Sequence, residues 1–267
     1  MTFKEKYGQT ALIAGASEGM GAAYAFALAE SGFDLVLIAR RAAPLEATAN
    51  QIIKQFGVGV TTVTCDLADA DATEKIVKAI GDKPIDFLVY NAALSYIGPY
   101  VATNFITHGN IAQVNMVTQL AMVHYFGGKM VERGRGGVVI MASIAGFQGS
   151  GYLATYAATK AFNRVLAEGL WYEWKSKGVD VIACCAGATA TPNYINTKPG
   201  KASALEPKPQ LPEQVVKECL KKIGKTPSFI SGTGNKWVSF LMQRIFSRMM
   251  AVKMISDGMV KMYRIKD

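Results

Sequence analysis

The sequence predicts an α/β fold, a single domain in which helices cover both faces of a doubly wound parallel sheet. Six short runs are almost continuously apolar and rich in β-branched residues, as strands buried on both faces are. Longer segments with helical periodicity separate these runs, and repeated strand–helix units imply parallel strands joined by right-handed crossovers. No linker interrupts residues 1–267, so we expect one domain.

The expected strands are residues 10–15, 33–39, 58–65, 85–90, 136–142 and 179–187. The expected helices are residues 19–31, 44–56, 69–80, 103–133 and 153–177. Two regions depart from this alternation. Residues 188–212 are rich in Pro, Thr, Asn and Lys and follow a strand, so we interpret them as a substrate loop at the carboxyl edge of the sheet. Residues 235–267 place Met and Phe at helical spacing among basic side chains, which predicts an amphipathic helical C-terminal extension.

The amino-acid composition limits the cellular compartments and the binding partners to expect. No apolar run reaches the ~18–20 residues of a membrane span, and the first ten residues lack the apolar core of a secretory signal. The four cysteines show no CxxC spacing and the two histidines stand in no ligand cluster, so we expect a cytoplasmic protein without disulfides or metal. The net charge of +9 comes from scattered basic residues, which argues against nucleic acid and favours a phosphorylated ligand.

A glycine-rich turn follows the first expected strand and opens a helix. In the segment GASEGMG, Gly15, Gly19 and Gly21 allow a tight turn and a close approach of the backbone to a pyrophosphate at the helix N-terminus. The spacing is GxxxGxG rather than the commoner GxGxxG, and a plain glycine-rich turn is the alternative. Its place at the first strand–helix turn nevertheless predicts a dinucleotide site in a Rossmann-type sheet.

The second expected strand ends in ARR, where an NAD site usually places a carboxylate for the ribose 2′-hydroxyl. Arg40 and Arg41 instead suit a 2′-phosphate, because guanidinium groups form forked, charge-assisted hydrogen bonds. Unless they only begin a solvated loop, they predict NADP(H) as the cofactor. Asp66 follows the third strand and could either accept a hydrogen bond from the adenine amine or cap a turn. Asn91 ends the fourth strand and could either lie beside the bound cofactor or form a turn.

The segment ATYAATKAF places a phenol and an ammonium group one helical turn apart. Tyr156 and Lys160 share one helix face because four residues separate them. A tyrosine with its usual pKa near ~10 is a poor acid at neutral pH, and a neighbouring cation lowers that pKa. Ser143, just after the fifth strand, can donate a hydrogen bond to a carbonyl oxygen. Each residue alone fits a purely structural role, but together they predict acid–base chemistry on a carbonyl group.

These motifs resemble those of the short-chain dehydrogenase/reductase family. The likeness covers residues 8–232 and includes GASEGMG, YNAA, VNM, YAATK and AGATATP, although Ala14 and YNAA replace the family's usual Thr and NNAG. It implies an oxidoreductase in which Tyr156 is the general acid/base and Ser143 positions the carbonyl. Lys160 would also bind the nicotinamide ribose, and Asn115 would hold a water in the proton relay. The cofactor contacts that it implies are Gly15, Ser17, Gly19, Met20, Gly21, Arg40, Arg41, Asp66, Asn91, Tyr156, Lys160, Gly187, Thr189 and Thr191.

The segments KEKYG, GASEGMG, ARR and FGV more narrowly resemble bacterial 7β-hydroxysteroid dehydrogenases and related ketosteroid reductases. Residues 142–159 carry no charged side chain and include Phe147, Tyr152 and Leu153, which suits an apolar substrate. We therefore expect an NADP(H)-dependent enzyme that interconverts a ketone and a secondary alcohol on a bulky apolar substrate such as a hydroxysteroid. A 3-oxoacyl thioester reductase and a non-catalytic NADP(H) sensor are the alternatives. The resemblance also implies a homodimer or homotetramer.

The extension 235–267 has three interpretations. It can pack on the domain or on a partner subunit, or it can form a Met-rich lid over an apolar substrate, since Met adapts to irregular shapes. It can also be a basic amphipathic foot on an anionic membrane surface. We expect packing combined with a lid.

Overall fold

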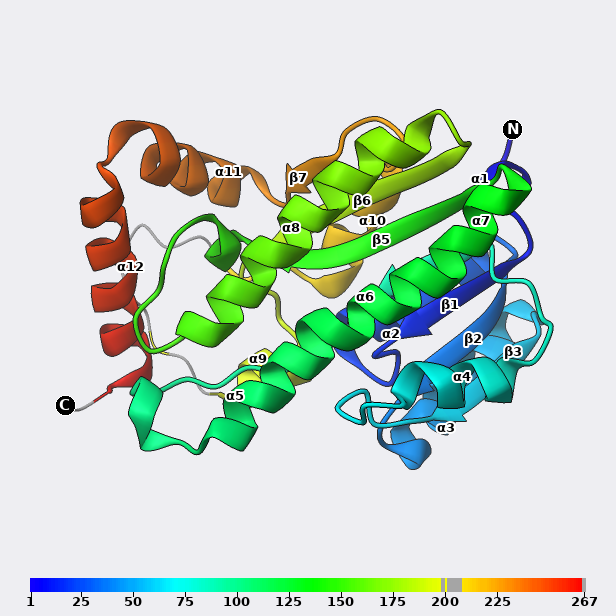
Figure 1. The fold of residues 1–267 in the computed structure, drawn as a ribbon, viewed down its shortest axis with the longest axis horizontal. Helices are drawn as coiled ribbons and strands as arrows, with labels where there is room; N and C mark the ends of the chain where they lie inside the picture. The colour runs from blue at the N-terminus through cyan, green and yellow to red at the C-terminus, as the bar shows by residue number, and fades with distance from the viewer. Residues whose placement is uncertain (198–199, 201–207, 266–267) are drawn as a thin grey trace.

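The structure is a computed structural model that describes residues 1–197, 200 and 208–265. Seven parallel strands form one sheet in the order β3-β2-β1-β4-β5-β6-β7 (Figure 1). They are β1 Thr10–Ala14, β2 Asp34–Ala39, β3 Val60–Thr64, β4 Phe87–Tyr90, β5 Gly136–Ser143, β6 Val179–Ala186 and β7 Ser228–Ile230. The six expected strands are confirmed, with slightly shifted ends. The order reverses between β1 and β4, and a ligand binds outside the carboxyl ends of the strands at such a point.

Helices cover both faces of the sheet, as expected. They are α1 Phe3–Tyr7, α2 Gly19–Glu30, α3 Ala42–Phe56, α4 Ala72–Ile80, α5 Phe105–Ala112, α6 Thr118–Met122, α7 Gly128–Arg133, α8 Ala154–Lys175, α9 Pro192–Asn196, α10 Pro212–Lys222, α11 Thr233–Phe240 and α12 Arg248–Tyr263. One face packs against α2, α3 and α10, and the other against α4, α6, α7 and α8. Neighbouring strand residues serve opposite faces: Cys184 belongs to the first core and Cys185 to the second.

Three segments differ from the expected elements. The long helix expected at 103–133 contains two π-helical turns, Gln113–Val117 and Val123–Gly127. The C-terminal extension is two helices rather than one, because Phe246 and Ser247 are extended between α11 and α12. The expected loop 188–212 contains α9 and the start of α10, and residues 198–199 and 201–207 of it lie outside the described residues.

A buried carboxylate joins the first strand to the fourth. Asp86, 5% exposed, precedes β4 and accepts hydrogen bonds from the backbone N–H groups of Gln9 (2.7 Å) and Thr10 (3.2 Å). Arg133, at the end of α7, approaches the other carboxylate oxygen at 3.3 Å. This arrangement ties together the starting ends of two central strands.

Replacing Asp86 by Ala is expected to lower the free energy of unfolding by about 2–4 kcal/mol, because buried N–H donors and a guanidinium group lose their partner. Urea unfolding followed by circular dichroism measures it. The matched control is Asp82→Ala, which removes an exposed carboxylate nearby and should stay within about 0.5 kcal/mol of the wild type. Equal stability of the two variants would contradict the proposed role of Asp86.

Candidate active site

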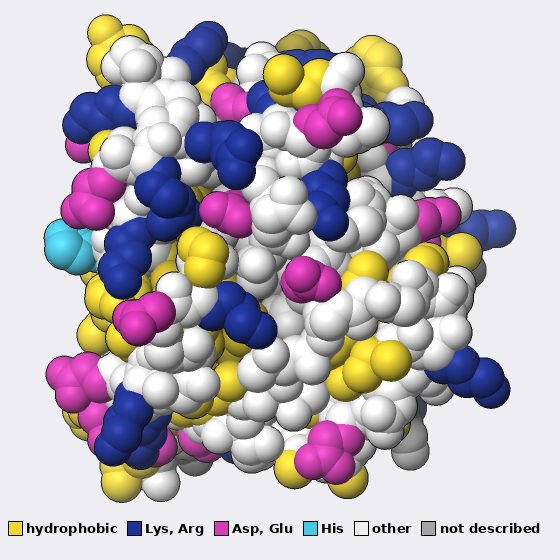
Figure 2. Space-filling model, turned by 90° about the vertical axis from the view of Figure 1, so that its right-hand side faces the viewer, with side chains coloured by type: hydrophobic (Ala, Val, Ile, Leu, Met, Phe, Trp, Pro, Cys, Tyr) yellow, Lys and Arg dark blue, Asp and Glu magenta, His cyan; other side chains and the backbone are white. Residues whose placement is uncertain are grey.

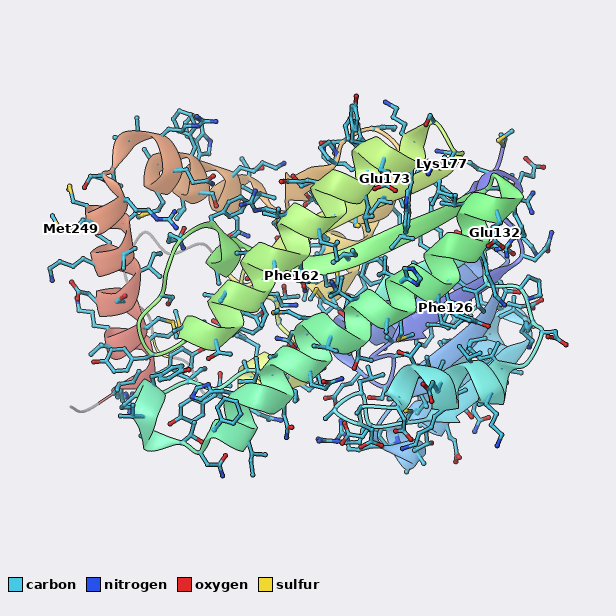
Figure 3. All side chains as sticks on the ribbon, in the orientation of Figure 1. Phe126, Glu132, Phe162, Glu173, Lys177 and Met249 are labelled. Carbon is cyan, nitrogen blue, oxygen red and sulfur yellow. The ribbon has the colours of Figure 1, made fainter. Side chains whose placement is uncertain are left out.

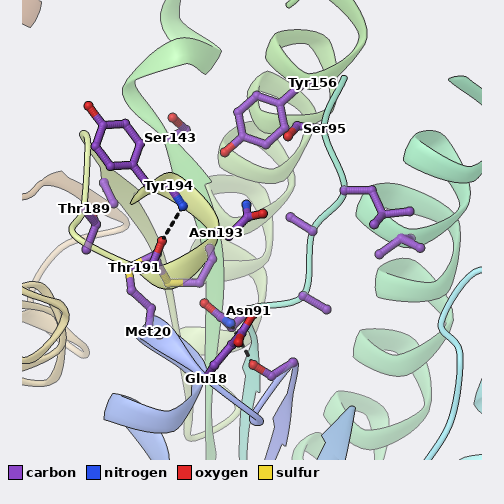
Figure 4. Close-up of a pocket in the computed structure, with 18 of the residues that line it drawn as sticks. Glu18, Met20, Asn91, Ser95, Ser143, Tyr156, Thr189, Thr191, Asn193 and Tyr194 are labelled. Atoms are coloured by element: carbon purple, nitrogen blue, oxygen red, sulfur yellow. Dashed lines mark hydrogen bonds between the residues drawn. The ribbon is translucent and has the colours of Figure 1, made fainter. Parts of the chain in front are cut away.

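A cavity of about 600 Å³ opens at the carboxyl edge of the sheet, beside the point where the strand order reverses (Figure 4). Every site residue predicted from the sequence lines this cavity except Gly21 and Asn115. Its lining includes the arginines that follow β2 as well as the tyrosine and lysine of α8. The residues predicted to bind the cofactor and those predicted to be catalytic therefore line the same cavity.

The first strand–helix turn is built from close backbone contacts. Gly15 and Gly19 have φ angles of +82° and +59°, a region that side chains with a Cβ rarely adopt. A Cβ on Gly21 would overlap the carbonyl oxygen of Gly15, so this glycine lets α2 start against the turn. Asn91, at the end of β4, donates from its amide to the same carbonyl at 3.1 Å. Asn91 thus connects the glycine-rich turn to the sheet by a hydrogen bond, and it also lines the cavity.

The arginines after β2 pair with acids at the rim of the cavity. Arg41 lies 2.9 Å from the Glu18 carboxylate and Arg40 lies 3.6 Å from that of Asp66. Both guanidinium side chains are more than half exposed, so each pair contributes only about 0–1 kcal/mol and is readily exchanged for another anion. Asp66 also accepts a hydrogen bond from the N–H of Ala68 at 3.0 Å, which makes it a turn aspartate within the cavity wall.

The strand end and the long helix bring three side chains together. Ser143 ends β5, and Tyr156 and Lys160 lie in the first turns of α8 (Figure 4 shows the serine and the tyrosine). The Tyr156 phenol hydrogen-bonds with Ser143. Lys160 is 3% exposed; its ammonium group donates to the carbonyl of Met141 at 2.8 Å and lies 5.5 Å from the centre of the Tyr156 ring. The predicted triad is therefore assembled at the floor of the cavity.

Burial shifts the pKa values of Tyr156 and Lys160. Desolvation raises the pKa of Tyr156 above its usual value, and the hydrogen bond with Ser143 lowers it in part. Desolvation also lowers the pKa of Lys160 to about 8. The sequence analysis expected a lowered pKa for Tyr156, but its net pKa is raised, because burial is the largest cause of the shift.

Asn115 lies behind the cavity wall, fully buried in the π-helical turn of residues 113–117. Its amide donates to the Leu94 carbonyl at 2.9 Å and to the Thr159 hydroxyl at 3.0 Å, and its oxygen accepts from the Leu94 N–H at 2.8 Å. These bonds tie the segment after β4 to α8 one turn from the tyrosine. A role for Asn115 in a proton relay stays a prediction.

The segment after β6 closes one side of the cavity. Thr189 donates to the Gly187 carbonyl at 3.1 Å, and Thr191 caps α9 by accepting from the N–H of Tyr194 at 3.2 Å. The methyl group of Thr191 packs against Gly19, where a Cβ would stand 3.0 Å away. Asn193 and Tyr194 also line the cavity, and the sequence analysis did not single them out (Figure 4).

The C-terminal helix supplies a residue that sequence reasoning missed. Tyr263, at the end of α12, lines the cavity and contributes to the raised pKa of Tyr156. Side-chain contacts hold α12 in place: Arg248 donates to the Phe147 carbonyl and Ser256 accepts from the Gly151 N–H, each at 2.8 Å. Packing of the extension on the domain is thus confirmed for α12. No motif marks Tyr263 in the sequence, because only the tertiary fold returns the chain to the cavity.

Three apolar side chains were expected around a substrate, and of these Phe147 and Tyr152 are not among the cavity-lining residues. Leu153 lines the cavity. Phe147 lies elsewhere, 4.7 Å beneath the guanidinium group of Arg164, because it packs between α8 and the second core. Among the described residues, no group of three or more His, Cys, Asp or Glu side chains is placed to hold a metal ion.

Comparisons with known proteins agree with this geometry. The family model described as short chain dehydrogenase matches residues 9–202. A 7β-hydroxysteroid dehydrogenase of Clostridium sardiniense is 34% identical over 236 residues, which are 88% of this chain and 90% of that protein. A very-long-chain 3-oxoacyl-CoA reductase-B of Danio rerio is 31% identical over 81% of this chain and 69% of that protein.

Solved structures are similar as well. One solved for the stereoselectivity of 7β-hydroxysteroid dehydrogenase has a TM-score of 0.90 and 30% identity, covering 96% of this chain and 99% of that chain. A short-chain dehydrogenase from Sphingobium yanoikuyae in complex with NADPH has a TM-score of 0.75 and 26% identity, covering 90% of this chain and 97% of that chain. The first similarity extends over nearly the whole length, so it includes most of the C-terminal extension.

Replacing Lys160 by Met is expected to change how stability depends on pH. Between its folded pKa of about 8 and the usual 10.5, the unfolded chain binds a proton that the folded chain has released, so Lys160 makes stability rise with pH. The unfolding free energy of the wild type relative to Lys160→Met should increase by about 2 kcal/mol from pH 7.5 to 10. Urea unfolding at several pH values tests this, with exposed Lys54→Met as control. A difference that is independent of pH would contradict the lowered pKa.

Proposed function

The chain belongs to the short-chain dehydrogenase family and is an oxidoreductase that acts on hydroxyl and keto groups, and on that premise we propose that it interconverts a ketone and a secondary alcohol with NADP(H) as cofactor. The proposed substrate is bulky and apolar, such as a hydroxysteroid. The proposal rests on one observation: Ser143, Tyr156 and Lys160 line the same cavity as Arg40 and Arg41.

The residues present fit an NADP(H) cofactor. The glycine turn brings the backbone to the cavity surface at the N-terminus of α2, where N–H groups and the helix dipole favour a pyrophosphate. Arg40 and Arg41 would exchange their exposed acidic partners for the ribose 2′-phosphate. Lys160 and Thr191 would hold the nicotinamide end. When bound, the nicotinamide supplies or accepts the hydride at the reacting carbon.

The proton chemistry is assigned to α8 and the end of β5. In reduction, Ser143 and Tyr156 donate hydrogen bonds to the carbonyl oxygen, and Tyr156 gives it a proton as negative charge develops there. The raised pKa of Tyr156 suits this step, because the phenol keeps its proton at neutral pH. Lys160 then stabilises the phenolate that remains, and Asn115 fixes the position of α8 through Thr159.

The substrate end of the cavity supports a bulky apolar ketone. Ile97, Leu153, Tyr194 and Tyr263 line it, so apolar and aromatic surfaces surround the triad. The Clostridium sardiniense relative is named for a hydroxysteroid substrate, which agrees with this lining. A 3-oxoacyl thioester reductase is the second candidate, since relatives of that name share about a third of the sequence. A non-catalytic NADP(H) sensor is the third, and measurable turnover would exclude it.

We further propose a cytoplasmic homodimer or homotetramer. Large apolar side chains on α5 and α8 are exposed and would be covered in such an assembly: Phe105, Ile106, Val165 and Tyr172. Sedimentation velocity would give the oligomeric state directly.

Tyr156→Phe is expected to reduce NADPH-dependent turnover by about 10²–10⁴-fold, because the ring remains but the transferable proton is lost. A spectrophotometric screen of ketosteroids, acyl thioesters and small aromatic ketones identifies the substrate and measures the rate. The dissociation constant for NADPH should change by less than about threefold, since the cavity keeps its shape. Tyr172→Phe, on the exposed face of the same helix, is the matched control. Near-normal turnover in Tyr156→Phe would refute the mechanism.

Arg40→Ala with Arg41→Ala is expected to weaken NADPH binding by roughly tenfold or more, because charge-assisted hydrogen bonds to the 2′-phosphate contribute about 1.5–3 kcal/mol. NADH binding should change by less than about threefold, since NADH has no such phosphate. Fluorescence titration of both nucleotides measures the two constants. Lys54→Ala with Arg135→Ala, two exposed basic residues that do not line the cavity, makes the same change in net charge and is the control. Equal losses for both nucleotides would contradict NADP(H) specificity.

A further inference from the structure

The helix that follows β7 turns its apolar side outward. Trp237, Phe240, Leu241 and Ile245 recur at spacings of three and four from α11 through the π-helical turn Leu241–Ile245, and all are exposed. At the start of α12, Met249, Met250 and Met254 are exposed as well, and Met249 projects away from the molecule (Figure 3). We call these seven side chains the tail patch.

The inner side of the same helix is polar. Asn235 and Ser239 lie one turn apart and are 4% and 5% exposed. The Asn235 amide donates to the Ser231 carbonyl at 2.9 Å and approaches the Gln210 side chain at 3.4 Å. A helix that served only to pack on its own domain would bury its apolar face and expose its polar one. The orientation of α11 is the reverse, while Trp237 remains 64% and Ile245 62% exposed.

Basic side chains predominate in the segment that carries the tail patch. Within residues 233–265 the basic side chains are Lys236, Arg244, Arg248, Lys253, Lys261 and Arg264, and Asp257 is the single acid. Lys236 and Arg244 stand four residues before and after Phe240, so both share its helix face. Figure 2 views the opposite end of the molecule, where basic and acidic side chains are interspersed. Elsewhere in the chain basic side chains pair with acids, as Lys75 does with Asp69 and Asp71. With six basic side chains and one acid, residues 233–265 carry a net charge of +5, more than half of the +9 of the whole chain.

We propose that the tail patch binds the surface of an anionic lipid bilayer. Its apolar side chains would enter the boundary between headgroups and acyl chains, and the flanking lysine and arginine side chains would contact the anionic headgroups. Charge selects this occupant over a second copy of the chain, because two such surfaces facing each other would repel. None of the described helices is long and apolar enough to cross a membrane, so the contact is with the surface.

Co-sedimentation with large unilamellar vesicles tests the proposal without any substrate, so its outcome is independent of the proposed enzymatic function. The full-length protein should bind vesicles of phosphatidylcholine with about 30% phosphatidylglycerol and bind pure phosphatidylcholine at least tenfold more weakly. Raising the salt to about 0.5 M should weaken binding to the anionic vesicles. Binding should also shift tryptophan emission to the blue, and Trp237→Phe should abolish the shift while retaining binding.

Two variants separate the apolar from the electrostatic contribution. Phe240→Ser with Ile245→Ser should weaken vesicle binding at least tenfold, and so should Lys236→Glu with Arg244→Glu. The matched control is Lys54→Glu with Lys78→Glu, which makes the same charge change on exposed residues of α3 and α4 and should bind like the wild type. None of these residues lines the cavity, so turnover of a soluble ketone should be unchanged.

Three results would overturn the proposal. The first is no binding of the wild type to anionic vesicles. The second is equal loss of binding in the tail variants and in the control, which would indicate a general effect of net charge. The third is dissociation of an oligomer by Phe240→Ser with Ile245→Ser, seen by sedimentation velocity, which would assign the tail patch to an interface between copies of the chain.

Discussion

Two side chains of α8 donate hydrogen bonds to the same carbonyl oxygen, that of Met141 in β5: the Lys160 ammonium at 2.8 Å and the Asn163 amide at 3.3 Å. These bonds hold the helix against the strand just before Ser143. Gly146 permits the approach, because a Cβ there would overlap the backbone of Lys160. The separation of serine, tyrosine and lysine follows from this contact, and so does the burial that shifts the pKa values of the last two. The chemistry therefore depends on how closely α8 packs on β5.

The features that could be predicted from the sequence are those set by residues close together along the chain. Apolar runs located six of the strands, because strands buried on both faces have little polar alternation. Helix periodicity predicted that Tyr156 and Lys160 share one face, and both line the cavity. The glycines after β1 predicted a dinucleotide turn, and Gly15 and Gly19 line the same cavity. The short strand β7 was missed because its three residues carry too little pattern.

What could not be predicted depends on which groups meet across the fold. The place of Tyr263 follows from the return of α12 to the cavity, which no local pattern encodes. The pKa of Tyr156 was expected to fall because a cation lies one turn away, yet burial dominates, and burial is a property of the packed structure. The outward orientation of α11 is similar: the helical spacing of its apolar residues was visible, but the side that faces solvent was not.

The C-terminal extension links these features. Its polar inner face at Asn235 and Ser239 secures α11 beyond β7, and Arg248 and Ser256 secure α12 over the segment between β5 and α8. The last turn of α12 then places Tyr263 in the cavity, while the first turns leave Met249 and Met250 exposed. An apolar ketone partitions from water into lipid for the same reason that it enters an apolar cavity. A segment that reaches both a bilayer surface and the cavity would shorten the path between the two, which is a physical reason for one extension to carry both surfaces.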